Sequence, residues 1–172
     1  MSESKGKNKK SAMECAISYL AGSMRTCDEV RKHLEKKEYG TVEIEETVKE
    51  LTDLRYIDDY QYALRYYEYN YSRNRGSGRA QQALASKGVD RSIIRNAYED
   101  YMYENNADEY ELAYKLAEKE LYITPDLVGE DAEPKRREIS DKLLARIARK
   151  LQTRGFSVDI VARVLSRIRG ME

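Results

Sequence analysis

The side chains best suited to nucleophilic or metal chemistry in this sequence are two cysteines, Cys15 and Cys27, and one histidine, His33. A catalytic thiol needs a base beside it, and a zinc site needs several thiolate or imidazole ligands. A single histidine excludes zinc sites built from several histidines and disfavours histidine-based catalysis. We therefore expect Cys15 at the edge of a core, Cys27 in a helix-capping turn and His33 on the surface.

Two further patterns resemble active-site elements but have simpler explanations. The adjacent carboxylates Asp58 and Asp59 cannot face one site from a helix, so helix capping accounts for them better than acid–base catalysis. The run Gly76-Ser77-Gly78 lacks the Gly-Lys-Ser/Thr ending of a phosphate-binding loop and follows no strand pattern. We predict a turn between helices here. The sequence thus predicts no enzyme, no cofactor and no metal site.

The strongest signal for binding is the distribution of charge. The 172 residues carry 31 basic and 31 acidic side chains, so the formal net charge is zero. Residues 65–95 and 134–172 are rich in basic side chains, whereas residues 96–133 are rich in acidic ones. Such blocks either pair with each other as solvated helix faces or meet a polyanion or an acidic partner. Both interpretations stay open.

The first basic block also contains the densest mixture of aromatic and basic side chains. Seven of the fifteen tyrosines lie between residues 56 and 71. Helical spacing places most of them in or beside a core, yet too many share one helix for all to face inward. Arg73, Arg75 and Arg79 follow directly, and this mixture suits a polyanion or an acidic protein groove. Solvated cations at a helix end are the alternative.

These residues belong to a repeated unit. Three segments align without gaps, at residues 34–51, 84–101 and 151–168. Their apolar positions recur with the spacing of one helical face, on either side of a short turn. The second and third copies have Gly88 and Gly155 in this turn, and the first has Glu38. Each copy is predicted to be the end of one helix, a tight turn and another helix.

A further helical segment precedes each copy, at residues 11–23, 59–73 and 108–121. The fold is therefore predicted to be all-α, with three tandem three-helix, helix-turn-helix-like repeats in an elongated, curved array. Six residues are expected to cap helices: Thr26, Thr41, Asp58, Ser77, Asp90 and Ser157. The expected parts are a disordered basic tail at 1–10, repeats at 11–57, 58–106 and 107–172, and an acidic surface loop inserted at 123–134.

Composition agrees with this organisation and excludes several classes of protein. Charged residues make up 36% of the chain, and only two prolines and nine glycines occur, which favours helix nearly throughout. The sequence contains no run of eighteen apolar residues, so no transmembrane helix is predicted. The first residues lack the apolar core of a secretory signal. We expect a cytoplasmic protein with reduced thiols and no membrane contact.

Three short motifs stand in a fixed order: Tyr56-Ile57-Asp58-Asp59 with Ala63, then Gly78-Arg79 through Leu84 to Lys87-Gly88-Val89, then Arg154-Gly155-Phe156-Ser157. Together with the repeats they resemble the RecX family, the bacterial regulatory proteins of the RecA recombinase. The resemblance covers residues 11–169 and implies a curved array of three-helix repeats with no catalytic residue.

The resemblance implies binding to RecA nucleoprotein filaments, in the filament groove, with inhibition of recombinase, ATPase and coprotease activities in DNA recombination, repair and the SOS response. A monomer with weak contact to DNA is expected. The basic residues expected to contact the filament or DNA are Arg73, Arg75, Arg79, Lys87, Arg146, Arg149, Lys150 and Arg154. In contrast, changing Glu109, Glu111 and Glu118 of the acidic block to lysine is expected to leave filament binding unchanged or stronger. A direct DNA-binding protein and a helical-repeat adaptor for another protein remain alternatives.

Overall fold

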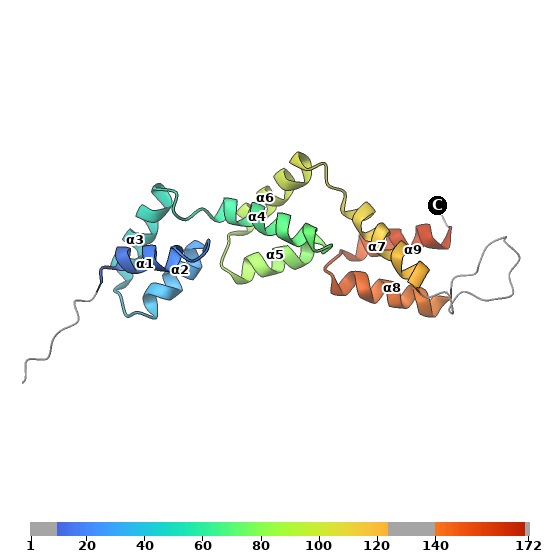
Figure 1. Ribbon diagram of the computed structural model, residues 1–172, viewed down its shortest axis with the longest axis horizontal. Coiled ribbons are helices and arrows are strands. Elements are labelled where there is room, and N and C mark those ends of the chain that lie inside the picture. The colour runs from blue at the N-terminus through green and yellow to red at the C-terminus, as the bar shows by residue number, and fades with distance from the viewer. Residues whose placement is uncertain (1–9, 124–139, 171–172) are drawn as a thin grey trace, which may run out of the picture.

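The computed structural model describes residues 10–123 and 140–170, which form nine α-helices and no strand (Figure 1). The helices follow one another as three groups of three along the long axis of an elongated molecule. Module 1 contains α1 (Ala12–Leu20), α2 (Cys27–Glu35) and α3 (Thr41–Asp53). Module 2 contains α4 (Asp59–Ser72), α5 (Ser77–Ser86) and α6 (Arg91–Glu104). Module 3 contains α7 (Glu109–Ile123), α8 (Asp141–Thr153) and α9 (Val158–Arg169). The predicted all-α array of three-helix repeats is confirmed.

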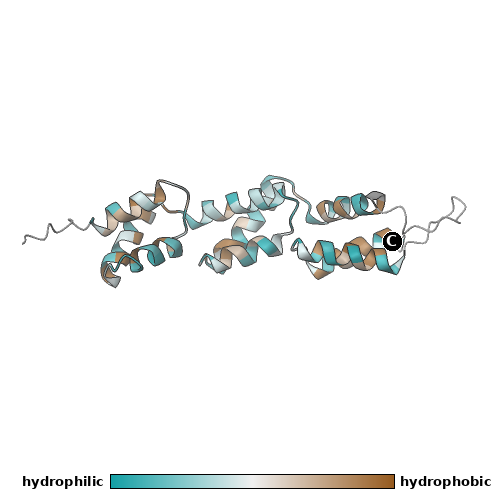
Figure 2. Ribbon diagram, turned by 60° about the horizontal axis from the view of Figure 1, so that its bottom comes forward, coloured by the Kyte–Doolittle hydropathy of each residue, from teal (hydrophilic) through white to brown (hydrophobic). Residues whose placement is uncertain are grey.

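Each module has its own apolar core. The buried side chains form three separate clusters, one for each group of helices, and apolar segments recur in all three groups in Figure 2. The aligned leucines Leu34, Leu84 and Leu151 are each at most 1% exposed, so the positions shared by the repeats are core positions. Each module therefore gains its hydrophobic stabilisation largely by itself, as in other repeat proteins.

The turn between the second and third helix has the same geometry in all modules. Glu38, Gly88 and Gly155 have φ angles of 59°, 75° and 89°, in the left-handed region. In each module the N–H that follows this residue reaches back to the carbonyl of the aligned leucine, at 3.2 to 3.3 Å. This is the Schellman arrangement, which satisfies a carbonyl at the end of the second helix. The predicted helix–turn–helix step is confirmed.

Four of the six predicted helix caps are confirmed. Side-chain oxygens of Thr26, Asp58, Asp90 and Ser157 each accept a hydrogen bond from a backbone N–H in the first turn of their helix. The other two predictions were wrong by one residue. Gly40 and Gly76 occupy the cap positions of α3 and α5, so Thr41 and Ser77 are the first helical residues.

Two predicted segments fall mostly outside the part of the chain that the structure describes. Of the predicted tail at 1–10 only Lys10 is described, and of the predicted loop at 123–134 only Ile123 is, where α7 ends. Among the described helices, none combines the length and the apolar character that a membrane span requires.

Candidate interaction surface

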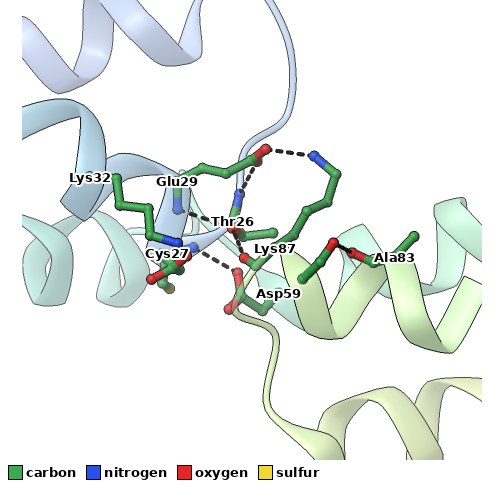
Figure 3. Close-up of polar contacts among 9 residues, drawn as sticks. Thr26, Cys27, Glu29, Lys32, Asp59, Ala83 and Lys87 are labelled. Atoms are coloured by element: carbon green, nitrogen blue, oxygen red, sulfur yellow. Dashed lines mark hydrogen bonds and ion pairs between the residues drawn. The ribbon is translucent and has the colours of Figure 1, made fainter.

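Module 1 meets module 2 at the start of α2 (Figure 3). The first module interface consists of Thr26–Glu29 on one side and of Asp59 with Lys87–Gly88 on the other. The Thr26 hydroxyl donates to the Lys87 carbonyl at 2.7 Å, and the Cys27 N–H donates to Asp59 Oδ1 at 2.9 Å. Lys87 Nζ lies 2.6 Å from Glu29 Oε1. The Cys27 N–H, which has no partner within its own helix, is thus hydrogen-bonded by the neighbouring module.

The charged groups of the first module interface perturb one another. Burial works to raise the pKa of Glu29, but hydrogen bonds, above all from Lys87, outweigh it and hold that pKa below its usual value. The same pairing raises the pKa of Lys87. Burial raises the pKa of Asp59 and of the Cys27 thiol. At neutral pH the Glu29–Lys87 pair is therefore ionised, and the Cys27 thiol keeps its proton.

Module 2 meets module 3 in the same way, at the start of α5. The second module interface consists of Gly76–Arg79, Thr153–Phe156 and Glu109. Here the Gly76 N–H donates to the Arg154 carbonyl at 3.0 Å, and the Gly78 N–H donates to the Gly155 carbonyl at 3.2 Å. The two modules are therefore joined by direct bonds between their backbones.

Two arginines add bonds across the second module interface in opposite directions. Arg79 Nη1 donates to the Thr153 carbonyl at 3.0 Å. Arg154 Nη1 donates to the Asn74 carbonyl at 3.1 Å. Bonds from a charged donor are stronger than neutral ones, so both arginines stabilise the relative placement of modules 2 and 3.

A carboxylate at the first position of the first helix completes each interface. Glu109 is 5% exposed and accepts from the Ser77 N–H at 2.8 Å and from the Tyr98 hydroxyl at 3.0 Å. Asp59 accepts from the Cys27 N–H in the same manner. In both cases the acceptor follows the donor by 32 residues. Sequence reasoning missed both roles, and this repeated spacing is the signal that identifies them.

The interfaces also explain why the turn contains a glycine in modules 2 and 3 but Glu38 in module 1. A Cβ atom on Gly88 would lie 2.3 Å from Asp28 Cβ, and one on Gly155 would lie 2.6 Å from Arg79 Cβ. Both glycines are covered by the preceding module. Glu38 occupies the same turn in module 1, which no module precedes in the described structure, so a side chain is accommodated there.

Of the eight basic residues predicted to bind a partner, five make ion pairs or hydrogen bonds that join modules or neighbouring helices. Lys87 belongs to the first module interface, and Arg79 and Arg154 belong to the second. Arg146 and Lys150 both pair with Glu120, which is only 2% exposed; Arg146 Nη2 lies 3.2 Å from its carboxylate. Their surroundings indicate a structural role for these five side chains.

The remaining three, Arg73, Arg75 and Arg149, take part in no ion pair among the described residues. Arg73 and Arg149 are exposed, and Arg75 is half-buried. Glu109 has a structural role that the sequence did not indicate, because its buried carboxylate accepts hydrogen bonds from Ser77 and Tyr98 of module 2.

A row of tyrosines runs along α4 from the edge of the module 2 core to Arg73. The rings of Tyr62, Tyr66 and Tyr69 follow one another at centroid distances of 6.3 and 6.5 Å. The Arg73 guanidinium lies 5.4 Å from the centroid of Tyr69, whose side chain is half exposed. In contrast, Tyr67 is fully buried in the core of module 2. The row therefore ends in an exposed combination of aromatic ring and cation.

His33 was expected on the surface, but it is partly buried. Its ring stacks on Tyr19 at 4.0 Å, and its Nε2 atom lies 3.7 Å from Cys15 Sγ. Cys15 thus has an imidazole neighbour that the sequence separation concealed. Burial and nearby lysines lower the pKa of His33, so the ring is neutral at physiological pH. The described residues contain no group of three or more metal-ligating side chains.

Comparison with known proteins places these features in context. A family model described as "RecX, first three-helix domain" matches residues 12–51, which lie in module 1. The Regulatory protein RecX of Bacillus subtilis (strain 168) is 29% identical over 165 residues, covering 95% of this chain and 57% of that protein. The Regulatory protein RecX of Bacillus cytotoxicus is 38% identical over 105 residues, covering 60% of this chain and 38% of that protein. The chain spans about half the length of the curated relatives it matches.

Two solved structures have a similar fold. The crystal structure of RecX from Lactobacillus salivarius superimposes with a TM-score of 0.72 at 25% identity, covering 91% of this chain and 93% of the other. A second structure, described as regulatory protein RecX, gives a TM-score of 0.68 at 26% identity and covers 94% of this chain and 72% of the other.

Proposed function

We propose that this chain, which is similar to RecX regulatory proteins over most of its length, binds RecA nucleoprotein filaments in the cytoplasm and restrains their recombinase, ATPase and coprotease activities without catalysing a reaction itself. The observation that carries this proposal is the match of the whole three-module array to RecX structures. In such an array each module contacts only its neighbours, so the array presents an extended surface. This surface suits a long, curved partner better than a compact protein with a single pocket would.

The contact surface that we propose is the end of the tyrosine row, where Tyr69 and Arg73 lie side by side, together with Arg75 in the same turn. An exposed ring and a guanidinium can meet acidic side chains of a recombinase or the phosphates of its bound DNA. We include Arg149 because it too is exposed and takes part in no ion pair among the described residues. The other predicted cations are less suitable, since Lys87, Arg79 and Arg154 join neighbouring modules. Arg146 and Lys150 pair with Glu120 inside module 3.

Replacing Arg73 and Arg75 by glutamate is expected to weaken binding to a recombinase filament on single-stranded DNA by about tenfold or more. The reason is that two cations are lost from the contact and two repulsive charges are added. Binding is measured by co-sedimentation with the filament, and inhibition by the filament's rate of ATP hydrolysis. Circular dichroism is expected to show the same helical content as in the unmodified protein.

The matched control is the replacement of Arg91 and Arg95 by glutamate on α6, an equal change of charge at two exposed positions of the same module. It is expected to bind almost normally. An equal loss in both variants would indicate a general charge effect and would refute the assigned surface. Binding to DNA alone with the same affinity and a steep salt dependence would assign the protein to direct DNA binding. No effect on any filament would favour an adaptor for another protein.

A further inference from the structure

The two module interfaces use equivalent surfaces but different bonds. In the second module interface, backbone N–H groups of Gly76 and Gly78 bond directly to backbone carbonyls of module 3. In the first module interface, Thr26 takes the place of Gly76, and its hydroxyl rather than its N–H reaches across. Every described hydrogen bond of the first module interface thus involves a side chain.

Close backbone contact restricts motion at the second module interface. A Cβ on Gly76 would lie only 2.5 Å from the Gly155 carbonyl oxygen, and one on Gly78 would lie 2.9 Å from the same atom. The two backbones are therefore as close as glycine permits. Arg79 and Arg154 reach over the contact from opposite sides. Any rotation of module 3 against module 2 would break several of these bonds together.

The first module interface is held by weaker and more adaptable contacts. Its ion pair joins Lys87 and Glu29, whose side chains are 31% and 19% exposed, so salt screens it in part. The bonds of Thr26 and Asp59 depend on single side-chain rotamers rather than on backbone geometry. The long Lys87 and Glu29 side chains can follow small rotations of one module against the other, although the buried Thr26 side chain and the contact between Gly88 and Asp28 limit how far such rotations go.

The connection between modules 1 and 2 has a short segment where such a rotation can occur. Ile57 is 1% exposed and belongs to the core of module 1. The next residue, Asp58, is the N-cap of α4 and has an extended backbone. The bonds between Ile57 and Asp58 are therefore the boundary between two packed bodies.

From this contrast we propose that the array bends at the first module interface, about Ile57 and Asp58, while modules 2 and 3 move as one rigid unit. Module 1 then acts as an arm whose angle is set by the Thr26, Asp59 and Glu29–Lys87 contacts. This property goes beyond the proposed function and does not depend on the identity of the partner, because it follows from the bonds within the chain.

The test compares distances across the two interfaces in the full chain. Nitroxide labels are attached to exposed third-helix positions in pairs, Glu46→Cys with Glu99→Cys and Glu99→Cys with Ala162→Cys, after Cys15 and Cys27 are changed to serine. Double electron–electron resonance then gives a distance distribution for each interface. The distribution across the first interface is expected to be roughly twofold broader than that across the second. High salt is expected to broaden the first further and leave the second unchanged.

A substitution tests whether the Glu29–Lys87 ion pair restricts motion at the first module interface. Lys87→Met removes the ion pair with Glu29 and is expected to broaden the distribution across the first interface only. Lys49→Met is the control, since it removes the same charge from an exposed position of α3 that forms no ion pair among the described residues. Equal widths for both label pairs, or a broader distribution across the second interface, would overturn the proposal. So would a Lys87→Met distribution identical to that of Lys49→Met.

Discussion

Replacing Tyr67 by alanine is expected to remove about 3–5 kcal/mol of stability, the usual cost of deleting a buried aromatic side chain. The Tyr67 ring is fully buried and packs beside Tyr98 and Tyr101, at centroid distances of 5.5 and 6.2 Å. Its hydroxyl donates to the Ile94 carbonyl at 3.1 Å. No other side chain in module 2 fills a comparable volume at zero exposure, so the neighbouring helices cannot close the cavity without moving.

The loss is expected to be confined to module 2, because the three apolar cores are separate. Urea unfolding followed by circular dichroism should then show an early transition with about one third of the helical signal and a later one for the rest. Tyr67→Phe is the control; it keeps the ring and gives up one hydrogen bond, at a cost of about 1 kcal/mol. A single transition with the full amplitude in Tyr67→Ala would contradict the independence of the cores.

A second large effect is expected from Gly155→Ala. Gly155 has a φ of 89°, which costs any other residue about 1–2 kcal/mol. The added Cβ would also lie 2.6 Å from Arg79 Cβ and 2.7 Å from the Arg79 backbone nitrogen. Because backbone cannot yield as a flexible side chain does, the variant either strains module 3 or separates it from module 2. A total cost of about 2–4 kcal/mol follows.

Two measurements distinguish these outcomes for Gly155→Ala. The thermal midpoint reports the strain, and the distance between labels at positions 99 and 162 reports separation of the modules. Gly22→Ala serves as control, since a Cβ there meets no atom within 4 Å, and its effect is expected to stay within about 0.5 kcal/mol. If Gly155→Ala matched the control in both measurements, the close approach described for the second module interface would be wrong.

The helices, the cores and the turns could be predicted from the sequence because they depend on neighbours within about fifty residues. Leu34, Leu84 and Leu151 recur with the helical period, and their burial follows from that period alone. The family resemblance was readable for the same reason, since its motifs surround these turns. Cap positions were harder, because Gly40 and Gly76 provide no capping side chain and the residue after each is a common cap.

Contacts between modules could not be predicted in this way. Arg79 and Arg154 have the composition and position of binding residues, and nothing local shows that each reaches a carbonyl more than seventy residues away. The adjacent carboxylates Asp58 and Asp59 illustrate the same limit. Capping was the correct explanation for Asp58, but Asp59 serves the neighbouring module. Local rules thus missed the structural roles of Arg79, Arg154, Asp59 and Glu109 between modules.

The equivalence of the two interfaces means that modules are exchangeable parts. If residues 58–106 were deleted, Thr26 and Cys27 of module 1 would face the Arg154 carbonyl and the Glu109 carboxylate, the same types of acceptor that they meet in module 2. Asp28 would lie against Gly155, which again has no Cβ to obstruct it. When a gene gains or loses one whole unit, the donors of each module therefore still face suitable acceptors of the next. Duplication of a whole unit is thus a route by which such chains can change length.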